Sequence, residues 1–160
     1  MRRTCLFPHS TKEVFMKERE KAKTLLDQLY AMESSPDYVL SSPEAAVIQL
    51  LPFRKKKTEN FVVLFVDNKN RMICKKVVAK GTVDQIPVFP REIIRHAILK
   101  QASGIILGHN HPGGASEPSK QDRELTSKIK RIAMELGIRV LDHIIICDSG
   151  HFSFQENGYL

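Results

Sequence analysis

Two histidines that stand one residue apart, His109 and His111, are followed by Ser119 and Asp122 within the segment GHNHPGGASEPSKQD. Side chains at positions i and i+2 of a β-strand point to the same face, so we expect the two imidazoles to converge. The Gly-Gly pair after them lets the chain turn back, so that the next helix can present Asp122 to the same point. Two imidazoles and one carboxylate leave the fourth position of a tetrahedral zinc ion open for water, as in catalytic sites. Zinc lowers the pKa of that water towards neutrality.

Each part of this pattern also has a simpler explanation. A His-x-His sequence alone is a weak signal, and Ser119-x-x-Asp122 is also a capping box, in which both side chains bond to backbone N–H groups at the start of a helix. Taken alone, Asp122 is better explained as a cap residue than as a metal ligand. The two roles are compatible in one geometry, and the combination at this spacing favours a metal site.

The residues around the motif predict an alternation of strands and helices. Apolar, β-branched runs indicate strands, and apolar stripes between capping and glycine signals indicate helices. Helices are expected at about 11–32, from Ser42 as N-cap with Pro43 first, from Pro90, and from Ser119 to a stop at Gly137; strands are expected at 59–66, 71–81, 82–89, 104–111 and 138–148, with a tail hairpin around Asp148 to Gly150. The helix from Pro90 is expected to bury a stripe of Ile93, Ile94, Ala97 and Ile98.

The composition bounds the number of domains and the cellular location. The 160 residues, of which 42% are hydrophobic, suffice for one cored domain but hardly for two. We expect a helical appendage over residues 1–40 and one domain over 41–160. No run approaches the roughly 18 consecutive apolar residues of a membrane span, and no signal peptide is indicated, so we expect a cytoplasmic protein without membrane contact. The three widely spaced cysteines argue against a disulfide framework.

The net charge of +7 permits contact with an anionic partner, but it is spread over the chain rather than concentrated in one helix. Its densest run, residues 54–57, fits a solvated linker better than an anion-binding patch. No aromatic residues interleave with this run to stack on bases. The charge therefore predicts at most weak, non-specific contact with DNA.

The spacing His109-x-His111-Pro112, then six residues, then Ser119-x-x-Asp122 resembles the JAMM motif of the JAB/MPN metalloprotease family. The flanking PREIIRHAILKQASGIILGHNHPGG and LDHIIICD segments are similar to the bacterial RadC-like branch, and the resemblance covers about residues 42–160. It implies a single α/β domain of the JAB/MPN (cytidine-deaminase-like) type, with a curved mixed sheet flanked by helices. It also implies a zinc ion (Zn2+) held by His109, His111 and Asp122, and a Ser119 hydroxyl bonded to the reacting carbonyl oxygen.

The JAMM pattern also includes an upstream glutamate at the start of a strand, which takes a proton from water and passes it to the leaving amine. Glu59 fits this description, because it opens the strand expected at 59–66 and no apolar packing there requires it. Glu92 is the competing candidate, although the helix dipole is sufficient to explain a glutamate in the first turn of a helix. We therefore predict Glu59 as the general base, with geometry to decide between the two.

The resemblance implies a zinc-dependent metallopeptidase that hydrolyses an amide bond, isopeptide bonds included, in an unidentified peptide or protein. The alternatives are a DNA-repair-associated or DNA-binding accessory protein with a structural or vestigial metal site, and a protein-interaction module. Longer RadC-like proteins carry an N-terminal helix-hairpin-helix module associated with DNA. Because this chain has only about 58 residues there and lacks the Gly-rich hairpins, the DNA-repair label transfers poorly.

The remaining candidates for chemistry receive structural assignments. His143 lies in an apolar strand and is predicted to be a hydrogen-bonded core histidine without a catalytic role. His96 and His151 have neighbours that suit the surface. Arg91 is a candidate cation on the substrate side of the site.

Overall fold

The computed structural model describes residues 14, 16–21, 23, 38–81 and 87–160, and the chain divides into two compact units, Met1–Ser35 and Pro36–Leu160. In the first unit, residues 14, 16–21 and 23 are helical. The rest of the helix expected at about 11–32 lies outside the described residues. The assignment of an appendage over 1–40 and a domain over 41–160 remains a prediction.

A five-stranded mixed sheet with the strand order β2-β1-β3-β4-β5 forms the centre of the second unit. Its strands are β1 (Glu59–Val66), β2 (Met72–Gly81), β3 (Gly104–Asn110), β4 (Arg139–Cys147) and β5 (Gly150–Ser153). β3 and β4 are parallel, and the other neighbouring pairs are antiparallel. A parallel pair needs a crossover connection, which here contains α4 (Lys120–Glu135). The histidine motif therefore lies where β3 ends and the chain turns towards this helix.

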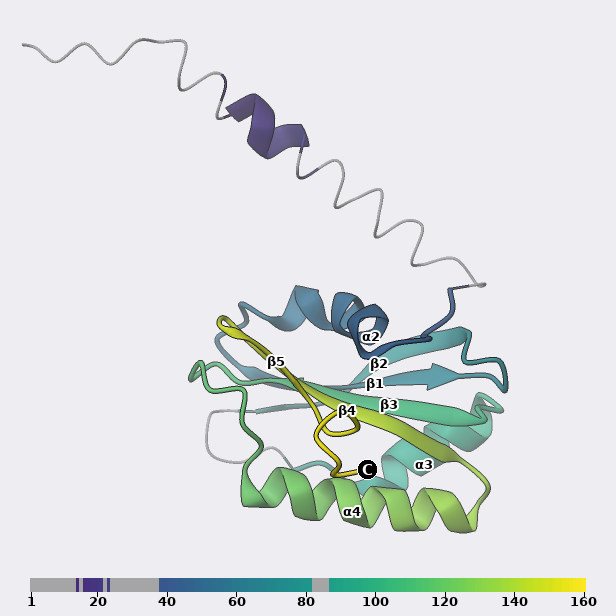
Figure 1. Cartoon of the computed structure of the whole chain (residues 1–160). Helices are drawn as coiled ribbons and strands as arrows, with labels where there is room; N and C mark the ends of the chain where they lie inside the picture. The colour runs from purple at the N-terminus through teal and green to yellow at the C-terminus, as the bar shows by residue number, and fades with distance from the viewer. Residues whose placement is uncertain (1–13, 15, 22, 24–37, 82–86) are drawn as a thin grey trace, which may run out of the picture. The chain divides into compact units, whose positions relative to one another are not determined.

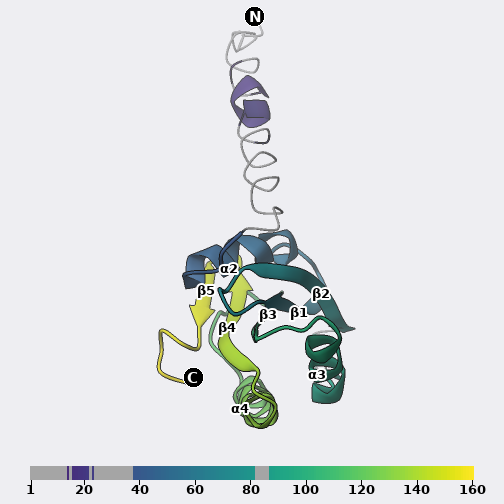
Figure 2. The same ribbon diagram turned by 90° about the vertical axis from the view of Figure 1, so that its right-hand side faces the viewer.

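Helices cover both faces of the sheet (Figures 1 and 2). α2 (Pro43–Leu50) lies on one face, and α3 (Pro90–Leu99) and α4 lie on the other. Alternate residues of β1 supply the two cores: Val62, Leu64 and Val66 pack on the α2 side, and Phe61, Val63 and Phe65 pack on the side of α3 and α4. A strand buried on both faces needs a continuous apolar run, which explains the sequence FVVLFV. The expected α/β domain with a mixed sheet flanked by helices is confirmed.

Local sequence signals set the ends of these elements. The Ser42 side chain accepts a hydrogen bond from a backbone N–H in the first turn of α2, and Pro43 is the first helical residue. The β1–β2 turn is held by the Asp67 carboxylate, which accepts hydrogen bonds from two backbone N–H groups of that turn. Gly137 has a φ of +70° and follows the end of α4. Among the described residues, no helix is long and apolar enough to span a membrane.

Two expectations about these elements differ from the structure. Residues 87–89 are not in a strand, and residues 82–86 of the predicted third strand lie outside the described part. Ile98 was expected in the buried stripe of α3 but is 57% exposed. Ala102 explains this difference, because it folds back to donate its N–H to the carbonyl of Ala97 and fills the core position at this end of the helix. The prediction for Ile98 is therefore wrong.

Candidate metal centre

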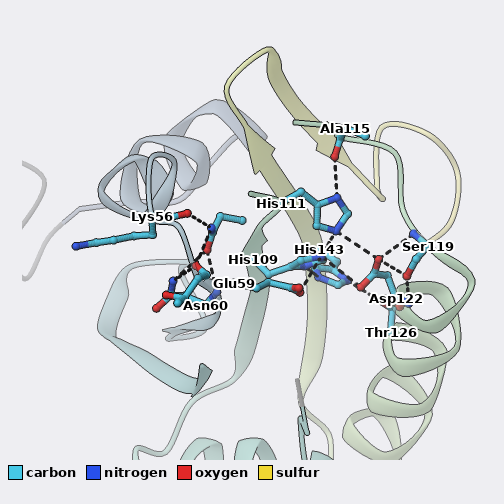
Figure 3. Close-up of polar contacts among 12 residues, drawn as sticks. Lys56, Glu59, Asn60, His109, His111, Ala115, Ser119, Asp122, Thr126 and His143 are labelled. Atoms are coloured by element: carbon cyan, nitrogen blue, oxygen red, sulfur yellow. Dashed lines mark hydrogen bonds and ion pairs between the residues drawn. The ribbon is translucent and has the colours of Figure 1, made fainter. Parts of the chain in front are cut away.

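The register of the central strands brings Glu59 and His109 to the same end of one sheet face (Figure 3). Phe61 of β1 is opposite His109 of β3, and Glu59 lies two residues before Phe61, on the same face of its strand. His111 follows β3 directly, and its N–H donates to the carbonyl of Ile146 at 2.9 Å, which continues the pairing with β4. The Nε2 atoms of the two histidines are 2.9 Å apart, so the expected convergence of the imidazoles is confirmed.

Four side chains from β1, from the end of β3 and from the start of α4 surround one point (Figure 3). His109 Nε2 lies 3.3 Å from Asp122 Oδ1 and 4.0 Å from Glu59 Oε1. His111 Nε2 lies 3.7 Å from Asp122 Oδ2. The ligand atoms of Glu59, His109 and His111 lie within 4.8 Å of one another, so this group could hold a metal ion. Imidazole nitrogens with carboxylate oxygens are a donor set that zinc accepts.

One ring proton of His111 points away from this centre. His111 Nδ1 lies 2.7 Å from the carbonyl oxygen of Ala115, which only accepts hydrogen bonds, so Nδ1 carries a proton. Burial lowers the pKa of His109 to about 4, although the charge of Asp122 opposes this effect, so that ring is neutral at pH 7. The centre itself favours positive charge, since a hydrogen bond to Asp122 raises the pKa of His111. Nitrogen and oxygen acceptors that converge in this way are the condition for binding a cation.

Asp122 combines the cap and the candidate ligand position. Its Oδ2 accepts hydrogen bonds from the Ser119 N–H at 2.8 Å and from the Ser119 hydroxyl at 2.6 Å, which completes a capping box at the start of α4. Burial alone would raise the pKa of Asp122, but the hydrogen bond with His111, the charge of His109 and the hydrogen bonds from Ser119 together lower it. The carboxylate is therefore ionised at neutral pH. The Ser119 hydroxyl is directed at Asp122, and its expected bond to a reacting carbonyl remains a prediction.

The two candidate glutamates lie in different environments. The Glu59 side chain is half-buried beside the histidines, and burial raises its pKa, with His111 opposing and Asp122 adding to the shift. Glu92 lies in the first turn of α3, where its carboxylate pairs with Arg95 at 3.2 Å and with Arg91 at 3.9 Å. Glu59 is thus the glutamate that lies beside the histidines, and its role as general base remains a prediction. The Arg91 side chain faces Glu92 and the ring of Phe89.

Asn110, between the two histidines, points to the opposite face of β3 and fixes the residues on either side of Glu59. Its Oδ1 accepts from the backbone N–H of Asn60 at 2.8 Å and from the Asn60 amide at 3.2 Å. Its Nδ2 donates to the carbonyl oxygens of Thr58 at 3.1 Å and Lys56 at 3.3 Å. Because the backbone is held at both neighbours of Glu59, the carboxylate is held near the histidines.

We expect Asn110→Ala to lower the free energy of unfolding by roughly 2–4 kcal/mol, because each buried donor left without a partner costs about 1–3 kcal/mol. Urea denaturation of the purified variant measures the loss. The matched control is Asn68→Ala in the exposed β1–β2 turn, which is expected to stay within about 0.5 kcal/mol of the wild type. Equal stability of the two variants would show that the Asn110 side chain does not hold this segment.

The contacts of two residues beside the centre, His143 and Thr126, were not predicted from the sequence. His143 was expected in the core, and it is fully buried, but its Nε2 contacts His109 Nδ1 at 2.8 Å. Thr126 of α4 contacts His143 Nδ1 at 2.6 Å. Burial lowers the pKa of His143 well below its usual range, which keeps this ring neutral. The only sequence signals were a histidine in an apolar strand and a threonine on the buried side of a helix.

Comparison with known proteins gives many related chains. A UPF0758 protein of Histophilus somni strain 2336 is 41% identical over 144 residues, which are 89% of this chain and 62% of that relative. A UPF0758 protein of Janthinobacterium sp. strain Marseille is 42% identical over 123 residues, or 76% of this chain and 54% of the relative. A UPF0758 protein of Vibrio cholerae strain M66-2 is 33% identical over 162 residues, covering 94% and 72%. The chain thus spans about three fifths of the length of the first of these relatives.

The family model described as "RadC-like JAB domain" matches residues 40–159, which include the whole sheet and all four side chains of the candidate centre. The match agrees with the resemblance seen in the histidine motif and its flanking segments. The mixed sheet flanked by helices is consistent with a JAB domain. The chain therefore belongs to the RadC-like JAB domain family.

Proposed function

We propose that this protein is a zinc-dependent metallopeptidase that hydrolyses an amide bond, either peptide or isopeptide, in a peptide or protein substrate. The observation that carries the proposal is the position of a half-buried carboxylate, Glu59, beside a converging set of His109, His111 and Asp122. A structural metal site would have no need of an additional carboxylate of raised pKa next to its ligands.

In the proposed mechanism His109, His111 and Asp122 would hold the metal. When bound, zinc supplies Lewis-acid polarisation of a carbonyl oxygen and lowers the pKa of water. Neutral imidazoles and an ionised carboxylate are the protonation states that metal binding requires. Burial lowers the pKa of His109, and the pKa of Asp122 is lowered overall, so these two residues hold these states at neutral pH. The pKa of His111 is raised, so this ring would release a proton when the metal binds.

Glu59 is proposed to move the proton. Water adds to the carbonyl carbon of the substrate and gives its proton to the Glu59 carboxylate, which then delivers it to the amine nitrogen as the C–N bond breaks. The products are a carboxylic acid and an amine. A raised pKa suits this task, because a base must also be able to release its proton to the leaving group. Ser119, at the rim of the same centre, is proposed to turn its hydroxyl from Asp122 to the carbonyl oxygen.

A peptide library tests this proposal. The zinc-loaded protein is incubated with peptides derived from a bacterial proteome, and new amino termini are identified by mass spectrometry. We expect cleavage that disappears after chelation and returns when zinc is added. Zinc-loaded protein that cleaves neither the peptides nor isopeptide-linked substrates would contradict the proposal.

Contact with DNA is a second candidate function, favoured by the net charge of +7 and by the exposed side chains of Lys55, Lys56 and Lys57 just before Glu59. We expect only weak binding that falls steeply as the salt concentration rises, because phosphate contacts release counterions. Fluorescence anisotropy with labelled duplex DNA at several salt concentrations measures this dependence. Tight, sequence-selective binding at physiological salt would make the DNA function the better account.

A further inference from the structure

A chain of hydrogen bonds runs from α4 through β4 to His109, on the side of its ring that faces away from the other candidate ligands (Figure 3). Thr126 Oγ1 lies 2.6 Å from the backbone oxygen of Asp122 and 2.6 Å from His143 Nδ1. His143 Nε2 lies 2.8 Å from His109 Nδ1. The side chains of Thr126, His143 and His109 are buried, with exposed fractions of 2%, 0% and 1%. Solvent therefore does not compete for these bonds.

The Asp122 carbonyl oxygen, at one end of this series of hydrogen bonds, determines which atom donates in each bond. The Asp122 carbonyl oxygen can only accept, so the single hydroxyl proton of Thr126 is donated to it. The Thr126 oxygen is then an acceptor for His143, whose proton must be on Nδ1. With that proton placed, His143 Nε2 is a lone-pair acceptor, and the proton in the 2.8 Å contact belongs to His109 Nδ1. A neutral His109 carries one ring proton, so its Nε2 is unprotonated.

We infer that Thr126 and His143 are positioning residues that hold His109 as the Nδ1–H tautomer, with a bare Nε2 directed at the metal centre. The centre by itself does not fix this tautomer. A proton on Nε2 could be donated to Asp122 Oδ1, which lies 3.3 Å away. Thr126 and His143 therefore favour a proton on His109 Nδ1, whereas Asp122 favours one on Nε2. With the proton on Nδ1, the lone pair of Nε2 is free to bind a metal ion.

The ring of His143 packs against two aromatic side chains. Phe154 stacks on it with ring centroids 4.7 Å apart, and Phe61 lies 5.5 Å away on a tilted plane. The backbone N–H of His143 donates to the buried Asp142 carboxylate at 2.7 Å, and that carboxylate also accepts from Ser153 at 2.6 Å. These contacts do not involve Thr126, so a change at Thr126 is expected to alter the proton pattern rather than the location of the ring.

The test compares Thr126→Val, which keeps the shape but removes the hydroxyl, with Thr126→Ser, which keeps the hydroxyl. Long-range 1H–15N correlation spectra of the metal-free full chain identify which nitrogen of His109 carries the proton. We expect Nδ1–H in the wild type and in Thr126→Ser. In Thr126→Val a substantial population of the Nε2–H form is expected, because His143 no longer has an acceptor that fixes its proton. Unchanged backbone amide spectra remote from the site establish that the variant is folded.

The consequence for the metal rests on the proposed function and is measured separately. Competition with a chromogenic chelator is expected to show that Thr126→Val binds zinc about 10–100-fold more weakly than the wild type, whereas Thr126→Ser binds it equally well. A wild-type tautomer in Thr126→Val overturns the inference, as does a shifted tautomer with unchanged affinity for zinc. If no form binds zinc, the proposed function fails, and the tautomer of the metal-free protein still decides the inference.

Discussion

Replacement of Glu59 by glutamine is expected to reduce the rate of amide hydrolysis by about 10²–10⁴-fold, the usual contribution of a general acid–base group. The amide keeps the size and the hydrogen-bonding capacity of the carboxylate but has no basicity with which to take a proton from water. Since Glu59 is half-buried at the start of β1, the neutral side chain is tolerated there, and the fold is expected to be retained. Initial rates on the best peptide substrate, with zinc content measured on the same sample, give the result.

Glu92→Gln is the matched control for this substitution. It removes a carboxylate that pairs with Arg95 and Arg91 on an exposed face of α3, so a change of less than about 1 kcal/mol in stability and no loss of rate is expected. A large loss of rate in Glu92→Gln with an active Glu59→Gln protein would exchange the two roles. Loss of zinc from Glu59→Gln would instead make Glu59 a ligand, because its carboxylate belongs to the group that could hold the ion.

Loss of zinc is the expected result of removing His109 or Asp122. The wild type is expected to hold about one zinc ion per chain, and His109→Ala or Asp122→Ala leaves two of the three proposed protein ligands, too few for a stable catalytic site. Elemental analysis after gel filtration measures the ratio of zinc to protein.

His151→Ala is the control for these variants, because it removes an exposed histidine of β5 that is not among the proposed ligands. It is expected to keep the full zinc content. Full occupancy in both His109→Ala and Asp122→Ala would show that the assignment of ligands is wrong.

Much of the fold follows from local signals in the sequence. The run FVVLFV predicted a strand, and the Ser42-Pro43 and Ser119-x-x-Asp122 signals predicted helix starts, because each depends on residues only a few positions apart. The predicted burial of Ile98 was wrong because it relied on such a local signal alone. Helical periodicity predicts which residues share a face of the helix. It does not predict that Ala102, beyond the end of α3, packs into the core, because this depends on the tertiary structure.

Only part of the candidate centre could be predicted from local sequence signals. The convergence of His109 and His111 follows from the alternation of side chains along one strand, and sequence alone predicts it. The contacts of His109 with His143, and of His143 with Thr126, depend on the parallel pairing of β3 with β4 and on the packing of α4 against the sheet. His109 and His143 are 34 residues apart in the sequence, and Thr126 and His143 are 17 apart. A pattern of neighbouring residues cannot predict contacts over such separations.

Anomalous X-ray diffraction at the zinc absorption edge, on crystals of the zinc-loaded protein, tests the central claim most directly. The account predicts one strong peak per chain within bonding distance of His109 Nε2, His111 Nε2 and an Asp122 oxygen, at about 2.0–2.2 Å from each. The Glu59 carboxylate is then expected outside bonding distance, but within hydrogen-bond reach of the open position. A structure of the zinc-loaded protein with no peak between the two histidines, or with the metal elsewhere in the chain, would contradict the account.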